Sequence, residues 1–257
     1  MPQISPHAIV EKGATLADDV RIGPFSYVGP NVRIGAGCVI ENNATVTGRT
    51  TLSEGNHVYP LAVIGESSDD SEEDGECIIG TANTLREHVT VYAGQDEPTR
   101  IGDDNLLMID CQVGPAAVIG DHCIFANYTH VREGARVEDY VRTSGFCLIN
   151  PGVTVGSYTF SAGYVIVDQD APPFAIIQGS PYRVRGVNTH NLRRCGFGED
   201  DIRCLKDAFR ELYNGQTRRP DDAAIARLRD SDADSAGVRR LVEFISEHSA
   251  GGESAHV

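Results

Sequence analysis

IGDDNLLMIDCQVGPAAVIGDHCIFANYTHVREGARVEDYVRTSGFCLINPGVTVGSYTFSAGYVIV, residues 101–167, decides the fold. An aliphatic or small residue returns at every sixth position of this stretch, from Ile101 to Val167. The same register holds over residues 4–64 and again over residues 79–91. Neither an amphipathic helix nor an alternating strand has a period of six. A sustained hexapeptide period is typical of a parallel β-helix, which is therefore the predicted fold.

The residues around each aliphatic position support this interpretation. A glycine often follows directly, as in Ile22-Gly23 and Ile119-Gly120, and suits a tight corner between short strands. Four positions after the aliphatic residue the side chain is small, as at Ala8, Cys38 and Cys123. Each hexapeptide then supplies one large and one small inward residue to a narrow core.

Two breaks in the register predict external loops, near residues 65–78 and 92–100. Residues 66–76 are acidic and hold no aliphatic anchor, while the second break contains Pro98. Carboxylates of the first insert could bind a metal ion, but no ligand spacing such as that of an EF-hand supports this.

The pattern changes after the double proline at 172–173, since proline cannot donate to a strand ladder. Beyond it, apolar residues recur at helical spacing. We expect helices from an Asn188 cap to Arg194 and over residues 199–213, 220–229 and 235–248. The prediction is a mainly β chain with two parts: residues 1–185, the β-helix, and residues 186–257, a helical domain with a loose tail.

Composition excludes several classes of function. The 257 residues carry a formal net charge of −15, which argues against nucleic-acid binding. No apolar run is long enough for a membrane span, and the N-terminus lacks a leader pattern. Seven cysteines show no paired spacing, which predicts free thiols in the cytoplasm. No metal or cofactor is predicted, because zinc needs three or four converging ligands and no such histidine spacing occurs.

Charge is uneven along the C-terminal part. Residues 183–219 hold nine basic and five acidic side chains, a net of +4, so the remainder nets −19. This basic strip fits either an acidic partner or plain solvation of helix faces, and the sequence leaves both open.

Several segments resemble one known family, the bacterial acyl-[acyl-carrier-protein]–UDP-N-acetylglucosamine O-acyltransferases. They are Asp104-Asn-Leu-Leu-Met-Ile109, Ile119-Gly-Asp-His-Cys-Ile-Phe-Ala-Asn127, Asp170-Ala-Pro-Pro-Phe174, Gln178-Gly179, Gly186-Val-Asn188 and Leu192-Arg-Arg-Cys-Gly-Phe197. The resemblance implies a left-handed β-helix with a helical C-terminal domain, assembled as a homotrimer. It also implies transfer of a 3-hydroxyacyl chain from acyl carrier protein to a UDP-amino sugar, the first step of lipid A synthesis.

The family's general base does not survive in this chain. In the family a histidine takes the sugar hydroxyl proton and the following aspartate orients it. Those two positions are Pro115 and Ala116 here. Further histidines of the family's site fall on Gln112, Gly134 and Asn150, and its oxyanion-binding glycine falls on Glu133. Whether the chain is an enzyme is therefore left open, as an acyltransferase of altered or lost activity. The alternative is a non-catalytic trimeric protein that binds acyl carrier protein or a nucleotide sugar.

Other family positions are kept. Asn188 and Arg194 match nucleotide contacts, His190 replaces an acidic residue, and Gly163 matches the glycine that sets the depth of the acyl groove. The resemblance places acyl carrier protein on the basic strip. Its candidate contacts are Arg183, Arg185, Arg193, Arg194, Arg203, Lys206 and Arg210.

The general base could instead be supplied by residues that lie one coil further along the chain. Three hexapeptides form one coil, so residues eighteen apart stack on the same face. His130 then lies beside Gln112, and Glu133 beside Pro115. His130 and Glu133 are thus a candidate relocated pair, with two surface residues at a subunit boundary as the alternative.

Overall fold

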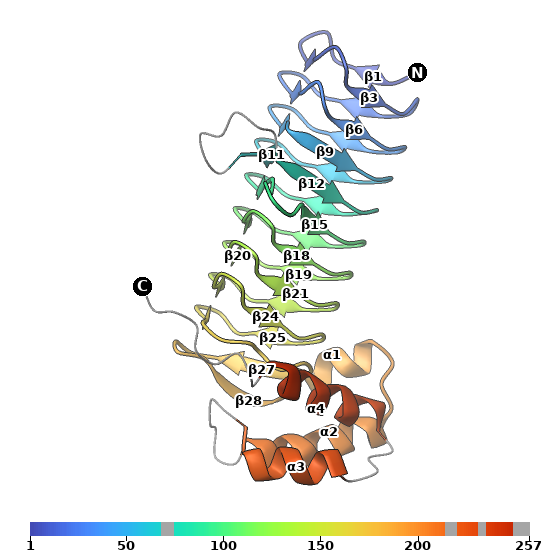
Figure 1. The fold of residues 1–257 in the computed structure, drawn as a ribbon. Coiled ribbons are helices and arrows are strands. Elements are labelled where there is room, and N and C mark those ends of the chain that lie inside the picture. Colours follow the sequence, from blue (N-terminus) through green and yellow to red (C-terminus); the bar gives the residue numbers. More distant parts are fainter. Residues whose placement is uncertain (68–74, 214–219, 231–234, 249–257) are drawn as a thin grey trace.

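The computed structural model describes residues 1–67, 75–213, 220–230 and 235–248. The predicted acidic insert therefore lies partly outside the described residues, and the predicted tail at 251–257 lies wholly outside them. Short strands stack along one axis, and four helices gather beyond the C-terminal end of the stack (Figure 1).

The described strands form three sheets that make the three faces of a prism, and all pairs are parallel except that of β27 with β28. Sheet A contains β1 (Gln3–Ile4), β4 (Arg21–Ile22), β7 (Val39–Ile40), β10 (His57–Val58), β13 (Thr84–Leu85), β16 (Leu106–Leu107), β19 (Ile124–Phe125), β22 (Arg142–Thr143), β25 (Phe160–Ser161), β27 (Ala175–Gln178) and β28 (Arg183–Val187). Sheet B contains β2 (Ile9–Val10), β5 (Tyr27–Val28), β8 (Thr45–Val46), β11 (Val63–Glu66), β14 (Thr90–Tyr92), β17 (Gln112–Val113), β20 (His130–Val131), β23 (Leu148–Ile149) and β26 (Ile166–Val167). Sheet C contains β3 (Thr15–Leu16), β6 (Arg33–Ile34), β9 (Arg49–Leu52), β12 (Glu76–Ile79), β15 (Thr99–Ile101), β18 (Val118–Ile119), β21 (Arg136–Val137) and β24 (Thr154–Val155).

This arrangement confirms the predicted parallel β-helix. Each strand pairs with the strand one coil later, and Val113 lies opposite Val131, eighteen residues on. The aliphatic residue of nearly every hexapeptide points inward and is buried, with Val28, Leu107 and Val131 all at most 1% exposed. The small inward residues Cys38 and Cys123 are also buried, so the core is a narrow column of alternating large and small side chains.

The two register breaks leave the stacking intact. Val63 pairs with Thr90, a step of twenty-seven residues, so one coil carries nine residues more than the usual eighteen. Cys77 pairs with Thr99, a step of twenty-two, and the next pair, Arg100 with Val118, returns to eighteen. The described strands on both sides of each break therefore keep their register.

Two edges of the prism carry ladders of aromatic side chains. At the edge between sheets A and B, the rings of Tyr128, Phe146 and Tyr164 stack with centroids 4.7 and 5.0 Å apart. At the edge between sheets C and A, His122, Tyr140, Tyr158 and Phe174 stack in the same way. All seven have positive φ, because each occupies the same left-handed corner position of its coil.

Strand pairing continues beyond the double proline, within the predicted β-helix of residues 1–185. Strand β27 still pairs in parallel with β25, and β28 then pairs antiparallel with β27. Pro172 and Pro173 lie at the corner just before β27, where no ladder donor is needed, and the Pro172 carbonyl accepts a bond from Thr159 Oγ1 (2.7 Å). The proposed boundary at residue 185 falls inside β28.

The four predicted helices are confirmed within a few residues. They are α1 (Thr189–Arg194), α2 (Glu199–Leu212), α3 (Asp222–Asp230) and α4 (Ala236–His248). One ion pair joins α4 to the prism: Arg240 contacts Glu138, which also accepts bonds from the Ser157 amide and hydroxyl (2.8 and 2.7 Å). In the described ranges, the helices are all too short or too polar to cross a membrane.

Candidate functional site

Pro115 and Ala116 lie at the edge between sheets B and C, at the corner that joins β17 to β18. The Pro115 carbonyl accepts a bond from the Gly134 amide (3.0 Å), and the Ala116 amide donates to Thr99 Oγ1 (3.0 Å). Ala116 has a φ of 56°, so it occupies the left-handed corner position. Neither side chain can accept a proton, and this corner therefore offers no general base of its own.

The candidate relocated pair lies one coil further on. His130 is opposite Gln112 in the sheet, as predicted, and Gln112 Nε2 donates to the Tyr92 hydroxyl (3.4 Å). Glu133 is exposed at the corner after β20. Among the described residues, no hydrogen bond or ion pair joins His130 to Glu133. They share one edge of the prism without forming a bonded dyad.

Helix α1 carries three of the predicted ligand contacts. Asn188 caps the helix, is 5% exposed, and donates from Nδ2 to the Tyr158 carbonyl (2.8 Å). Asn191 similarly donates to the Tyr140 carbonyl (3.1 Å), so α1 is tied to the edge between sheets C and A. Arg194 and His190 are exposed on this helix. The Asn188 side chain thus has a structural role, whereas Arg194 faces outward.

Gly163 lies on the third edge, next to Tyr164 in the aromatic ladder between sheets A and B. A Cβ atom at Gly163 would lie 3.4 Å from the Gly145 carbonyl oxygen, an ordinary van der Waals contact. The predicted site residues therefore occupy three different edges of the prism. One chain alone does not bring them together.

Local ion pairs engage three of the seven candidate carrier-protein contacts. Arg193 pairs with Glu199 (2.6 Å), Arg203 with Asp200 (2.8 Å) and Arg210 with Asp207 (2.8 Å). The hydrogen bond from Arg193 lowers the pKa of the Glu199 carboxyl. Arg185 bonds Gln178 (3.1 Å), and Arg183 and Lys206 are exposed. The basic residues of the strip are exposed, but nearby acidic side chains offset part of their charge.

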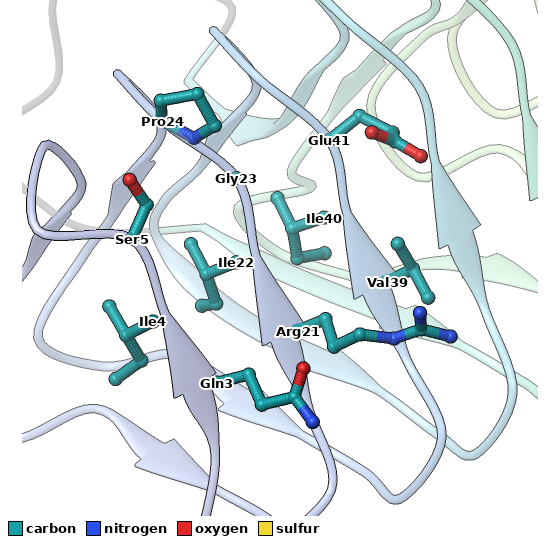
Figure 2. A pocket seen from close by; sticks show the side chains of 10 residues that line it. All are labelled: Gln3, Ile4, Ser5, Arg21, Ile22, Gly23, Pro24, Val39, Ile40 and Glu41. Atoms are coloured by element: carbon teal, nitrogen blue, oxygen red, sulfur yellow. The ribbon is translucent and has the colours of Figure 1, made fainter.

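Two shallow grooves lie on the outer face of sheet A. The first, near the N-terminus, has a volume of about 430 Å³ and lies over β1, β4 and β7. Figure 2 shows Gln3, Arg21 and Val39 along its outer surface, while Glu41 lies further off at the corner. Glu41 is bonded to His57 (2.9 Å). None of the predicted site residues lines this groove.

The second groove, which we call the Arg142 groove, has a volume of about 740 Å³ and lies between sheet A and the end of α1. Its lining includes Leu106, Ile124, His122, Tyr140, Arg142 and Arg194. Arg194 was predicted as a ligand contact, but Arg142 was not. A comparison with the positions eighteen residues before and after Arg142, Ile124 and Phe160, would have revealed it as a charged residue between two apolar ones.

In the described residues, no group of three or more histidine, cysteine or acidic side chains is arranged to hold a metal ion. The cysteines are unpaired, and five of the seven are buried. Burial raises the pKa of the Cys111 and Cys123 thiols to about 12. These thiols are packing residues rather than nucleophiles.

Comparisons with known proteins agree with this architecture. A model of the second domain of UDP-N-acetylglucosamine O-acyltransferase matches residues 170–252, and a hexapeptide-transferase model matches residues 13–48 and 98–133. The acyl-[acyl-carrier-protein]–UDP-N-acetylglucosamine O-acyltransferase of Saccharophagus degradans is 38% identical, over 94% of this chain and 95% of its own. The chain belongs to this acyltransferase family. The same enzyme of Stutzerimonas stutzeri is 35% identical, over 91% and 92% of the two chains.

Solved structures of the acyltransferase family superpose closely on the chain. LpxA from Acinetobacter baumannii gives a TM-score of 0.89 at 28% identity, covering 95% of this chain and 96% of that one. The UDP-N-acetylglucosamine acyltransferase from Campylobacter jejuni gives 0.88 at 30% identity, with the same coverage. Family membership and fold are thus established.

Proposed function

We propose that this acyltransferase family member does not catalyse the standard acyl transfer, and that its activity is altered or lost. The observation that carries the proposal is the corner at Pro115 and Ala116, which has no proton acceptor. In the standard reaction the sugar hydroxyl must lose a proton as it attacks the thioester. Loss of a general base typically lowers a rate by about 10²–10⁴.

Glu133 adds a second obstacle to the standard reaction. The negative charge that develops on the thioester oxygen is stabilised by hydrogen-bond donors. An exposed carboxylate at this corner would repel that charge instead. The replacement of a glycine by glutamate therefore acts in the same direction as the loss of the base.

A turnover assay tests the proposal. The purified chain and the Saccharophagus degradans relative are given 3-hydroxyacyl carrier protein and UDP-N-acetylglucosamine under the same conditions. We expect the chain to be at least about 100-fold slower. His130→Ala and Glu133→Ala variants then test the relocated pair, since a drop in any residual rate would assign it a catalytic role. A rate equal to that of the relative would refute the proposal.

The second candidate is a non-catalytic protein that binds acyl carrier protein or a nucleotide sugar. The exposed basic strip on a chain of net charge −15 favours it, because an acidic carrier would be repelled elsewhere. Steering of this kind weakens with salt, as the Debye length falls from about 10 Å at 0.1 M to about 3 Å at 1 M.

Charge reversal tests whether the basic strip binds acyl carrier protein or is only a solvated helix face. Arg203→Glu with Arg210→Glu on α2 should slow association with immobilised acyl carrier protein, measured by surface plasmon resonance. Arg33→Glu with Arg49→Glu is the matched control, because both arginines are exposed on sheet C and the change in net charge is the same. Binding that ignores salt and both double variants would exclude the strip as the docking surface.

A further inference from the structure

The groove near the N-terminus contains two side chains of opposite charge that do not pair with each other. We call it the Arg21 groove, and its lining includes Gln3, Arg21, Pro24, Val39 and Glu41. Within the described ranges, no ion pair joins Arg21 to Glu41. Both charges are therefore available to a ligand that lies in the groove.

Arg21 is the positive group of the groove. It is the first residue of β4, it is exposed, and its partners in the sheet are Gln3 and Val39. Figure 2 shows its side chain reaching from β4 toward β7 across the outer surface. The guanidinium makes no hydrogen bond or ion pair with any residue that the structure describes. All of its N–H donors can therefore bind an anion.

Glu41 is the negative group, and it is held in place from two sides. Its Oε1 atom lies 2.9 Å from His57 Nε2, and the His57 ring stacks on Tyr59 with centroids 4.2 Å apart. Its carbonyl accepts a bond from the hydroxyl of buried Ser26 (2.6 Å). The Glu41 side chain is still 40% exposed. Since a carboxylate accepts at both oxygens, Oε2 can receive a donor from a ligand.

Val39 separates the two charged groups. It lies opposite Arg21 in the sheet, and Glu41 follows it by two residues. Neighbouring strands are about 4.8 Å apart and a strand rises about 3.3 Å per residue, so the Cα atoms of Arg21 and Glu41 are about 8 Å apart. The groove thus has a positive end, an apolar middle and a negative end.

We propose that the Arg21 groove binds a small zwitterion, with its carboxylate on the Arg21 guanidinium, its ammonium on Glu41 Oε2 and its apolar spacer over Val39. A guanidinium holds a carboxylate by two parallel N–H bonds, and an ammonium donates to a carboxylate. The volume of about 430 Å³ lies within the range of small-molecule sites. The site is independent of the proposed loss of acyl transfer, because none of the residues considered for that reaction lines this groove.

The test uses the intact protein as purified and three probes. 6-Aminohexanoate has both charged groups on one alkyl spacer, hexanoate lacks the ammonium, and hexylamine lacks the carboxylate. Dissociation constants are measured by saturation-transfer difference NMR, which suits a large protein and weak ligands. We expect 6-aminohexanoate to bind at least about ten times more tightly than either other probe, because a hydrogen bond to a charged group contributes that much.

Variants decide whether Arg21 and Glu41 are responsible. Arg21→Gln and Glu41→Gln should each weaken binding of 6-aminohexanoate at least about ten-fold. Arg21→Gln should also weaken hexanoate but not hexylamine, and Glu41→Gln should do the reverse.

Two matched controls accompany these variants. Arg33→Gln is the control for Arg21→Gln, since Arg33 is exposed on sheet C of the same coil and also precedes an isoleucine. Glu54→Gln is the control for Glu41→Gln, since Glu54 is exposed at the corner after β9. All four side chains are at least partly exposed, so the variants should fold, which circular dichroism checks. The proposal is overturned if 6-aminohexanoate binds no more tightly than the other probes, if the Arg21 and Glu41 variants bind as wild type, or if the controls weaken binding equally.

Discussion

At the scale of single residues, the proposed loss of acyl transfer rests on Pro115 and Ala116. Both fit the corner of the coil: Ala116 takes the left-handed conformation, and the Pro115 carbonyl is bonded to the next coil. The corner is built without a titratable group, and the coils above and below it stack normally.

Restoring the two family residues should not restore the family's rate. Aspartate tolerates the left-handed region, so Pro115→His with Ala116→Asp should fold. Gln112, Glu133 and Gly134 would still surround the new pair, and catalytic groups that act as a unit are strongly non-additive. We expect the double variant to remain at least about ten-fold slower than the Saccharophagus degradans relative in the turnover assay. A rate matching that relative would show that Glu133 does not impair the reaction.

Thiol reactivity tests the burial of the individual cysteine side chains. Cys204 is exposed on α2, whereas burial raises the pKa of Cys77 to about 12 and that of Cys147 to about 11. A raised pKa leaves less thiolate, the reactive form, at pH 8. Burial also raises the pKa of Cys195.

With a chromogenic disulfide reagent at pH 8, we expect one fast thiol, one slower thiol, and five that react only after unfolding. Cys204→Ser should remove the fast phase alone. More than two reactive thiols in the folded protein would contradict the packing described for the core.

Among the elements, α4 is tied to the prism by a polar contact between Arg240 and Glu138. Glu138 accepts from the Ser157 amide and hydroxyl and contacts Arg240 of α4. Glu138→Ala would leave these donors unsatisfied, and we expect it to lower the free energy of unfolding by about 1–3 kcal/mol. Urea denaturation followed by circular dichroism measures this.

Glu247→Ala is the control for that measurement. Glu247 is 64% exposed and lies 3.8 Å from Arg240, so the change should cost less than about 0.5 kcal/mol. Equal losses in the two variants would mean that Glu138 acts only through its charge.

The elements differ in how far the sequence could predict them. The aliphatic period predicted the strands around Val113 and Val131, because an inward residue is dictated by the core. The helices followed from a cap at Asn188 and apolar spacing in residues 199–213. The pairing of Ser161 with Ile177 could not be predicted, because its step of sixteen residues departs from the period of eighteen.

The sequence predicted less of the candidate site than of the fold. The resemblance located Pro115, Glu133 and Arg194, but it could not show that Arg194 lies on a different edge of the prism from Pro115 and Glu133. The unsatisfied Nε of Arg142 was also invisible, since burial of one atom depends on how neighbouring strands and α1 pack around it.

For the whole molecule, we expect a homotrimer. The ring ladder of Tyr128, Phe146 and Tyr164 is 44%, 49% and 74% exposed, and a contiguous apolar surface of this kind is usually covered by a partner. Assembly would also bring site residues from different edges together, and closed cyclic symmetry is the common solution. Light scattering should give about 83 kDa, three times the chain mass of 27.7 kDa. A monomer mass at micromolar concentration would contradict this.

The coil of eighteen residues has a consequence for how such a chain can change during evolution. A segment inserted at a corner does not change the register of later coils. The nine additional residues between Val63 and Thr90 are an example. A deletion of six residues within the stack would instead turn all following strands onto the wrong face. Only whole coils can be added or removed without loss of phase, so the length of the stack changes in steps of about 4.8 Å. Insertions at the corners are therefore tolerated, whereas the number of stacked strands can change only by whole coils.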